Sequence, residues 1–371
     1  MTGRREFIAT AIVAAAGCKV VSMNSTDAYS VAVLGDTHFD TEPSSVYHSN
    51  YDLSNVHSKI QTQEFARNGE MWKERCPKLI NASAKLAKES RTAFILQMGD
   101  LIQGDCDDAI VHKIMLQDAV KVMKKPYPQD MPFLTVVGNH DYRGKGGREA
   151  YYNFVEPYMT EEILKLTGDF ALVKYPAFAF KKGPDLWVFC NFETDKIDQI
   201  CDLVESYKDV RYVFLVTHGP FTTCPFSRAH RWRLVGSKKV EGMRKRLYDI
   251  LMCRRAIVLS GHTHTTSYYR FKNSTGSFCE FTANSVWSAS NLATAVPRIA
   301  GAKAYKAGEM MYSDSRQEDL EREVDFFKGD LVDCYCSKGA GHYRLEVAPY
   351  GVWMLFYPGD SVRAAREFRL A

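Results

Sequence analysis

The arrangement of short apolar runs is the feature that most constrains how this chain can fold. Six runs rich in Val, Ile, Leu and Phe occupy residues 30–34, 93–98, 133–137, 186–192, 212–216 and 256–259. Such runs are typical of strands that are buried on both faces of a sheet. Helical periodicity occurs between them, as in Leu116, Ala119, Val120 and Met123. The alternation of strands and helices predicts an α/β layer structure.

Strand-like runs also occur beyond Gly276, at residues 278–282, 343–347 and 352–357. We expect these strands to form a second, mixed sheet. Residues 300–330 are strongly charged, and we expect them to form an insertion on the surface. Because the sequence contains no internal repeat and no linker rich in Pro, Gly or Ser, we interpret residues 29–371 as one domain.

The composition is that of a globular protein. Of the 371 residues, 46% are hydrophobic and 25% are charged, which excludes disordered and low-complexity classes. Lys and Arg number 48 against 44 Asp and Glu, and the net charge of +4 is too small to indicate a nucleic-acid-binding protein. No apolar run in the sequence reaches the ~20 residues that a membrane span requires.

Residues 1–28 have the features of an export signal and a linker. Arg4 and Arg5 precede a short apolar stretch at residues 7–17, as in signals of the twin-arginine type. Residues 15–18 resemble a lipoprotein box, which predicts a lipid anchor on Cys18, although Ala15 stands where such boxes have a bulky residue. The alternative is an amphipathic N-terminal helix. The favoured interpretation predicts an exported bacterial protein, either periplasmic or anchored to the membrane as a lipoprotein.

The other nine of the ten cysteines are scattered along the chain. The sequence has no C-x-x-C pair, so it supports neither a zinc ribbon nor a thioredoxin-type site. Cys190 lies in a strongly apolar run, where a reduced, buried thiol is expected. Cys334 and Cys336 are the candidates for a disulfide bond.

Five polar motifs each follow the end of one predicted strand. They are Gly35-Asp36-Thr37-His38, Gly99-Asp100, Gly138-Asn139-His140-Asp141, Thr217-His218-Gly219 and Gly261-His262-Thr263-His264. In an open α/β sheet, the loops at the carboxyl ends of the strands meet in one crevice, so we expect these side chains to lie together. Carboxylate, amide and imidazole ligands in combination suit Mn, Fe or Zn ions. The alternatives are helix N-caps for Asp36 and Asp100 and a structural hydrogen bond for His218.

The order of these motifs resembles that of the calcineurin-like metallophosphoesterase family: D-x-H, G-D, G-N-H-D or E, a lone His, and G-H-x-H. The resemblance covers residues 29 to 290. It implies a four-layer α/β/β/α sandwich of two mixed sheets, as found in metallo-dependent phosphatases.

The resemblance also implies two metal ions and a role for each motif residue. One ion would be held by Asp36, His38 and His264, the other by Asn139, His218 and His262, with Asp100 bridging the two. A metal-bound hydroxide would attack the phosphorus of a small phosphorylated substrate. His140 would be the general acid toward the leaving group, with an imidazole pKa close to working pH.

Gln103 departs from the family pattern, which often has an acidic residue or Asn three positions after the bridging Asp. A neutral amide at Gln103 can hold the ring of His140 in place but cannot stabilise an imidazolium as a carboxylate does. Asp141 is the alternative support for that ring. Purple acid phosphatases have a metal-binding tyrosine at this position. In having Gln there, the sequence resembles bacterial cyclic-nucleotide phosphodiesterases of the family.

The sequence therefore predicts a metal-dependent phosphoester hydrolase. The alternatives are a phosphodiesterase or nuclease of the same superfold, and a non-catalytic surface lipoprotein on that scaffold. We expect substrate specificity to lie in loops such as 142–148 and 221–237. The basic stretch at residues 227–246 is interpreted as a solvated loop and helix face, with phosphate or lipid binding as the alternative. The remaining histidines are expected to be surface or core residues: His48, His57, His112, His230 and His342.

Overall fold

The computed structural model describes residues 27–41, 43, 45–49, 56–191, 197–222, 224, 241–286, 299–303, 326–327 and 329–371. The predicted export signal and Cys18 lie outside the described residues. So do most of the predicted insertion at 300–330 and residues 227–240 of the basic stretch. Among the described residues, no helix is both long and apolar enough to cross a bilayer.

The first sheet is mixed and has six strands in the order β14-β13-β12-β1-β2-β3. Its strands are β1 (Tyr29–Leu34), β2 (Thr92–Gln97), β3 (Phe133–Thr135), β12 (Gly341–Ala348), β13 (Gly351–Pro358) and β14 (Arg366–Arg369). β1, β2 and β3 are parallel, whereas β12 runs antiparallel to β1. The carboxyl ends of the three parallel strands therefore open at one edge.

The second sheet is also mixed and has the order β10-β11-β8-β9-β7-β6-β5-β4. Its strands are β4 (Ala177–Lys182), β5 (Asp185–Cys190), β6 (Val213–Val216), β7 (Ile257–Ser260), β8 (Thr266–Lys272), β9 (Ser277–Thr282), β10 (Ile299–Ala300) and β11 (Leu331–Ser337). β5, β6, β7 and β9 are parallel to one another. One hydrophobic core joins the two sheets, with ring contacts such as Phe94 to Trp187 and Phe281 to Tyr343.

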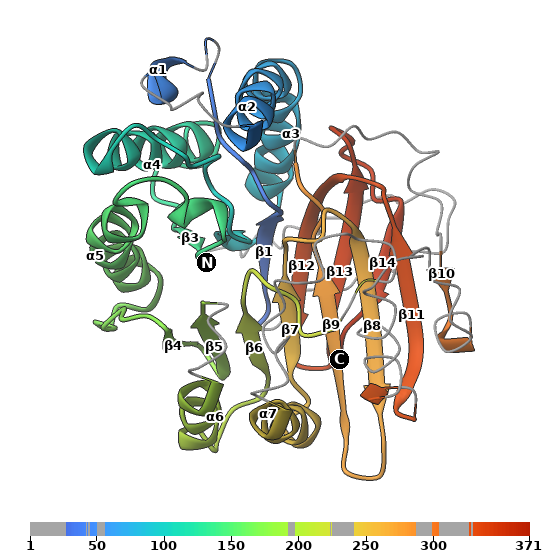
Figure 1. The fold of residues 1–371 in the computed structure, drawn as a ribbon. Coiled ribbons are helices and arrows are strands. Elements are labelled where there is room, and N and C mark those ends of the chain that lie inside the picture. Colours follow the sequence, from blue (N-terminus) through green and yellow to red (C-terminus); the bar gives the residue numbers. More distant parts are fainter. Residues whose placement is uncertain are drawn as a thin grey trace, which may run out of the picture.

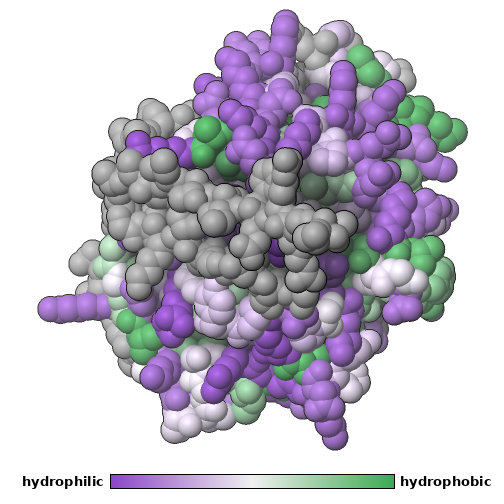
Figure 2. Space-filling model, turned by 180° about the vertical axis from the view of Figure 1, so that it is seen from behind, coloured by the Kyte–Doolittle hydropathy of each residue, from purple (hydrophilic) through white to green (hydrophobic). Residues whose placement is uncertain are grey.

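Helices cover the outer faces of both sheets (Figure 1). The first sheet is covered by α1 (Ser45–His48), α2 (Val56–Glu74), α3 (Cys76–Glu89), α4 (Ala109–Lys124) and α5 (Gly147–Thr167). A separate apolar cluster packs α6 (Ile197–Ser206) and α7 (Glu241–Cys253) against the second sheet. The structure is thus the predicted four-layer α/β/β/α sandwich. Viewed from behind, the described residues are mostly hydrophilic, with hydrophobic side chains in small separate groups (Figure 2).

The strands beyond Gly276 do not form a sheet of their own, so that prediction is wrong. β9 lies in the second sheet beside β7, while β12 and β13 extend the first sheet from β1. The register that pairs Val31 with Leu345 and Val33 with Tyr343 places apolar side chains of both strands in the shared core. The apolar composition of a strand does not specify which strand it pairs with, because every core strand carries a similar pattern.

The nine described cysteines are all free thiols, and eight of them are buried. Cys334 and Cys336, the candidates for a disulfide, lie two residues apart on β11 and so share one face of that strand. Neighbours of this kind are ~6.5 to 7 Å apart, which is too far for a disulfide without backbone movement. Burial raises the pKa of the Cys336 thiol and keeps it protonated.

Candidate metal centre

All five predicted motifs lie in loops that follow β1, β2, β3, β6 and β7. These loops approach one another so closely that the four glycines that begin a motif have no room for a side chain. A Cβ on Gly138 would lie 2.2 Å from Oδ1 of Asp100, and one on Gly261 would lie 2.3 Å from Oδ1 of Asp36. The glycines that begin four of the five motifs therefore permit the close packing of the loops around the site.

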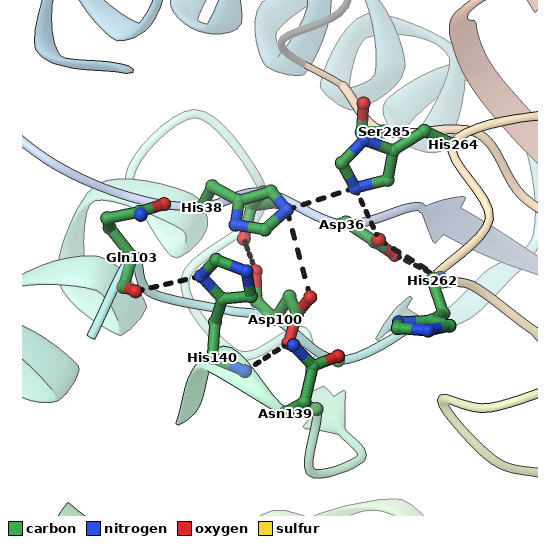
Figure 3. Close-up of polar contacts among 12 residues, drawn as sticks. Asp36, His38, Asp100, Gln103, Asn139, His140, His262, His264 and Ser285 are labelled. Carbon is green, nitrogen blue, oxygen red and sulfur yellow. Dashed lines mark hydrogen bonds and ion pairs between the residues drawn. The ribbon is translucent and has the colours of Figure 1, made fainter. Parts of the chain in front are cut away.

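A first group of possible ligands comes from the loops after β1 and β7 (Figure 3). The Nε2 atom of His264 lies 3.1 Å from Oδ2 of Asp36 and 3.1 Å from Nε2 of His38. One ligand atom from each of the three residues lies within 4.8 Å of the others. Asp36 also accepts a hydrogen bond from the backbone N–H of His262 at 3.0 Å, which ties the β1 loop to the β7 loop.

A second group contains Asp100, His218 and His262, with Asn139 beside them. The Nε2 atom of His218 lies 3.2 Å from Oδ2 of Asp100, 3.2 Å from Oδ1 of Asn139 and 3.2 Å from Nδ1 of His262. Asp100 also faces the first group, since its Oδ2 atom is 3.8 Å from Nε2 of His38. The structure thus brings all seven predicted ligands together, with Asp100 between the two groups.

The orientation of His218 shows that the second group suits a cation. Its Nδ1 atom lies 2.8 Å from the carbonyl oxygen of Met98, which can only accept, so Nδ1 carries the hydrogen. When the ring loses its other proton, the lone pair of Nε2 points at the oxygens of Asp100 and Asn139. Burial opposes protonation of His218, yet the carboxylates of Asp100 and Asp36 outweigh it and raise its pKa to about 10. The cluster therefore attracts positive charge, and a divalent metal ion fits this set of donors.

The backbone at the site is strained. Six non-glycine residues in the described part of the chain have a positive φ, and four of them are predicted ligands: His38, Asp100, His262 and His264, with φ of 41° to 68°. Left-handed backbone costs about 1 to 3 kcal/mol per residue and persists where the surrounding structure enforces it. Its concentration here is typical of a functional site.

His140 lies at the edge of the cluster, with its ring 4.4 Å from the ring of His38. Its backbone N–H donates to Oδ1 of Asp100 at 2.7 Å, and its Nδ1 atom lies 2.9 Å from the carbonyl oxygen of Gln103. Desolvation of the ring, opposed by Asp100, lowers the pKa of His140 to about 4. The prediction of a pKa close to working pH is therefore wrong for the protein without metal or substrate.

The support of His140 also differs from the prediction. The side chain of Gln103 accepts a hydrogen bond from Asn68 at 2.6 Å, and only its main-chain carbonyl reaches the histidine. Asp141 does not support the ring either, because its carboxylate accepts from the backbone N–H groups of Gly138 and Ile102. A main-chain carbonyl is available at any residue, so no pattern in the sequence indicates this contact.

Several supporting residues come from helices and were not predicted. Trp72 on α2 donates from Nε1 to the carbonyl oxygens of Thr37 and His38, at 2.8 and 3.0 Å. His112 on α4 lies 2.9 Å from the carbonyl oxygen of Asp141. These residues fix the main chain of the ligand loops, and nothing in the local sequence distinguishes them from ordinary core residues.

The sequence is similar to a known protein family. The family described as calcineurin-like phosphoesterase matches residues 29–266, whereas no curated protein matches the sequence significantly. Among solved structures, GAP50 of Plasmodium is 13% identical, with a TM-score of 0.48 over 92% of this chain and 88% of that one. Purple acid phosphatase PPD1 from yellow lupin is 10% identical, with a TM-score of 0.49 over 93% of this chain and 54% of that one.

A dimetal phosphatase from Danio rerio is also 10% identical, with a TM-score of 0.47 over 92% of this chain and 98% of that one. The assignment rests on the sequence match rather than on these distant structural likenesses. The match spans residues 29–266 of 371, which include all five motifs. The chain therefore belongs to the calcineurin-like phosphoesterase family.

Proposed function

We propose that this chain hydrolyses phosphate esters with the help of two metal ions. The observation that carries the proposal is the pair of ligand groups that meet at Asp100. One ion would be held by Asp36, His38 and His264, the other by Asn139, His218 and His262, with Asp100 shared between them. Mn, Fe and Zn suit these ligands. A bound metal pair supplies Lewis acidity toward phosphoryl oxygens and lowers the pKa of water.

The charge of the ligand set favours a phosphorylated substrate. Only Asp36 and Asp100 among the seven residues are carboxylates, so a divalent pair held by them keeps a positive excess. Developing negative charge on phosphoryl oxygens is stabilised by such an excess. We propose a small phosphate monoester or diester as the substrate.

His140 is proposed to transfer a proton to the leaving oxygen. Its Nδ1 atom is occupied by the carbonyl of Gln103, so Nε2 is the atom from which the proton would leave. Although the free ring has a pKa of about 4, an anionic phosphate placed beside it favours the imidazolium. The acid form would thus be produced by substrate binding.

Replacement of the shared carboxylate tests this proposal. We expect wild-type protein to bind about two metal ions per chain and to hydrolyse a nitrophenyl phosphate ester. Asp100→Asn should lose at least one ion and about 10³-fold in kcat. Asp185→Asn is the matched control, because Asp185 is a fully buried carboxylate that pairs with Arg211 outside the site. Metal analysis measures the number of ions per chain. Assays with monoester, diester, cyclic nucleotide and pyrophosphate substrates measure kcat.

Wild-type protein that hydrolyses none of these esters with Mn, Fe or Zn would contradict the proposal. Equal metal content in wild type and Asp100→Asn would contradict the shared role of Asp100. Circular dichroism of both variants distinguishes loss of metal from loss of fold.

Export is a further part of the proposal and rests on the sequence of residues 1–28. We propose that the protein is exported folded and is anchored by a lipid on Cys18. Fractionation of cells that express wild type and Cys18→Ser tests this: the wild type is expected with the membranes and the variant in the soluble exported fraction.

A further inference from the structure

Arg143 contacts the one site histidine that is outside the set of seven ligands. Its Nη1 atom lies 2.9 Å from both Nδ1 and Nε2 of His140. The side chain is half-buried, at 24% exposed, so the guanidinium lies at the rim of the cluster rather than beneath it. An oxygen that reaches His140 from the cluster would therefore also lie within reach of Arg143.

An ion pair holds Arg143 in this position. Its Nη2 atom lies 2.5 Å from Oδ2 of Asp105, which leaves Nη1 directed at His140. Asp105 lies in the loop after β2 and Arg143 in the loop after β3. The backbones of these two loops are also joined, since the N–H of Asp105 donates to the carbonyl of Arg143 at 2.8 Å. Gly104, the residue before Asp105, has a φ of +72°, and a Cβ there would lie 2.1 Å from the carbonyl oxygen of His140. The guanidinium is therefore placed by a tightly constrained pair of loops.

Asp105 is itself fixed from its other side. Nδ1 of His48 lies 3.1 Å from its carbonyl oxygen, and Nε2 of His48 lies 3.2 Å from Oδ2 of Asp40. The ring of His48 stacks on Phe65 with centroids 4.0 Å apart. Asp105 also has a left-handed backbone, with φ of 55°. Buried charges and strained backbone are a costly way to stabilise a fold but an effective way to orient a functional side chain.

We propose that Arg143 is a catalytic residue on the leaving-group side of the site, where Nη1 donates a hydrogen bond to the same ester oxygen that His140 protonates. The inference rests on the proposed function. A water molecule loses one proton to solvent and forms a bond to phosphorus while the ester P–O bond breaks. The electrons of the broken bond stay with the leaving oxygen, which takes one proton from His140. Arg143 stabilises the negative charge on that oxygen without giving up a proton, because a guanidinium stays protonated.

A series of leaving groups tests this role. We would assay Arg143→Met with aryl phosphates from nitrophenyl to unsubstituted phenyl phosphate, using metal-loaded protein. The weaker the leaving group, the more charge on its oxygen needs stabilising, so kcat/KM should fall about 10-fold for the nitrophenyl ester and about 100-fold for phenyl phosphate. In a His140→Ala background the same change should cost at least as much, because an oxygen that receives no proton carries more negative charge for Arg143 to stabilise.

Arg211→Met is the matched control. Arg211 forms a comparable ion pair with Asp185, at 2.6 Å, and is also partly buried, but it lies outside the site. This control should alter kcat/KM by less than about 2-fold for every ester, whatever it does to stability. Arg143→Lys keeps the charge but not the planar fork, and it replaces the Met variant if that one does not fold.

The outcomes separate the inference from the function on which it rests. An equal loss of kcat/KM for all leaving groups, or a loss that disappears in the His140→Ala background, would overturn the role of Arg143 while leaving the hydrolase intact. Absence of any ester hydrolysis by metal-loaded wild type would overturn both. A loss that grows with leaving-group pKa and persists without His140 would support the inference.

Discussion

The two sheets contribute different chemistry to the candidate metal centre. Loops of the first sheet supply both carboxylates and the amide, through Asp36, Asp100 and Asn139, together with His38. Loops of the second sheet supply only imidazoles, from His218, His262 and His264. The negative charge of the site is thus fixed on one sheet, while the other sheet gives ligands whose charge depends on protonation. A metal that binds both sets would couple the two sheets across the core.

The largest loss of kcat is expected when a ligand of the first sheet is replaced. Asp36 is fully buried and accepts the backbone N–H of His262, so it serves both as a ligand and as a link between the sheets. Asp36→Asn should lower kcat by about 10³-fold, whereas His264→Ala should lower it by about 10²-fold. The side chain of His264 is 35% exposed, so water can replace it as a ligand. Equal losses in steady-state kcat for the two variants would contradict this difference between the sheets.

Metal removal should weaken the connection between the sheets. A metal that binds only the folded state at about 1,000 times its Kd stabilises that state by ~4 kcal/mol. We therefore expect a chelator to lower the Tm of wild-type protein by about 5 °C or more. His218→Ala should show a smaller shift, since one imidazole of the second sheet is lost. The measurement is differential scanning calorimetry with and without chelator, and identical shifts would count against coupling through this sheet.

The imidazoles of the second sheet should make metal binding depend on pH. Because the pKa of His218 is raised to about 10 in the metal-free fold, its proton stabilises that fold fully below about pH 6.5. This contribution is lost as the pH rises toward 10. Metal must displace the proton, so affinity should rise by about tenfold per pH unit between these limits. Calorimetric titration in buffers of different ionisation enthalpy should detect about one released proton per chain, and none if His218 is not a ligand.

The smallest change in stability and activity is expected from a substitution on the outer face of the second sheet. Arg246 on α7 forms ion pairs with Asp198, Asp202 and Glu205 at 2.6 to 3.0 Å, all of them at the solvent-exposed surface. Exposed pairs contribute little because water and salt screen them. Arg246→Ala should therefore change the Tm by less than about 2 °C and leave kcat unchanged. A clear loss of activity in the steady-state assay would show that this basic segment has a role in substrate binding.

Much of the site could be predicted because ligand chemistry is local. Asp36 with His38, and His262 with His264, lie beside glycines at strand ends, so each motif is visible by itself. The predicted core strands occur in the structure with ends that differ by at most two residues, as for residues 133–137 against Phe133–Thr135. The role of each motif residue was predicted from the family resemblance that the order of the motifs carries. The spacing of the motifs alone does not show that Asp100 lies between two groups of ligands.

Other features depend on contacts between distant segments and left no local pattern. β8 and β11 alternate polar and apolar residues too weakly to be recognised, although Thr266–Lys272 pairs with Leu331–Ser337. Trp72 and Asn68 reach the site from α2, and the main-chain carbonyl of Gln103 supports His140. Such contacts follow from tertiary packing, which the sequence of a single helix or loop does not specify.

Anomalous diffraction from crystals of the metal-loaded protein tests the central claim most directly. Two peaks about 3.5 to 4 Å apart are expected, one bounded by Asp36, His38 and His264 and the other by Asn139, His218 and His262, with Asp100 touching both. A single peak, or peaks bound by other residues, would contradict a dinuclear centre shared by the two sheets.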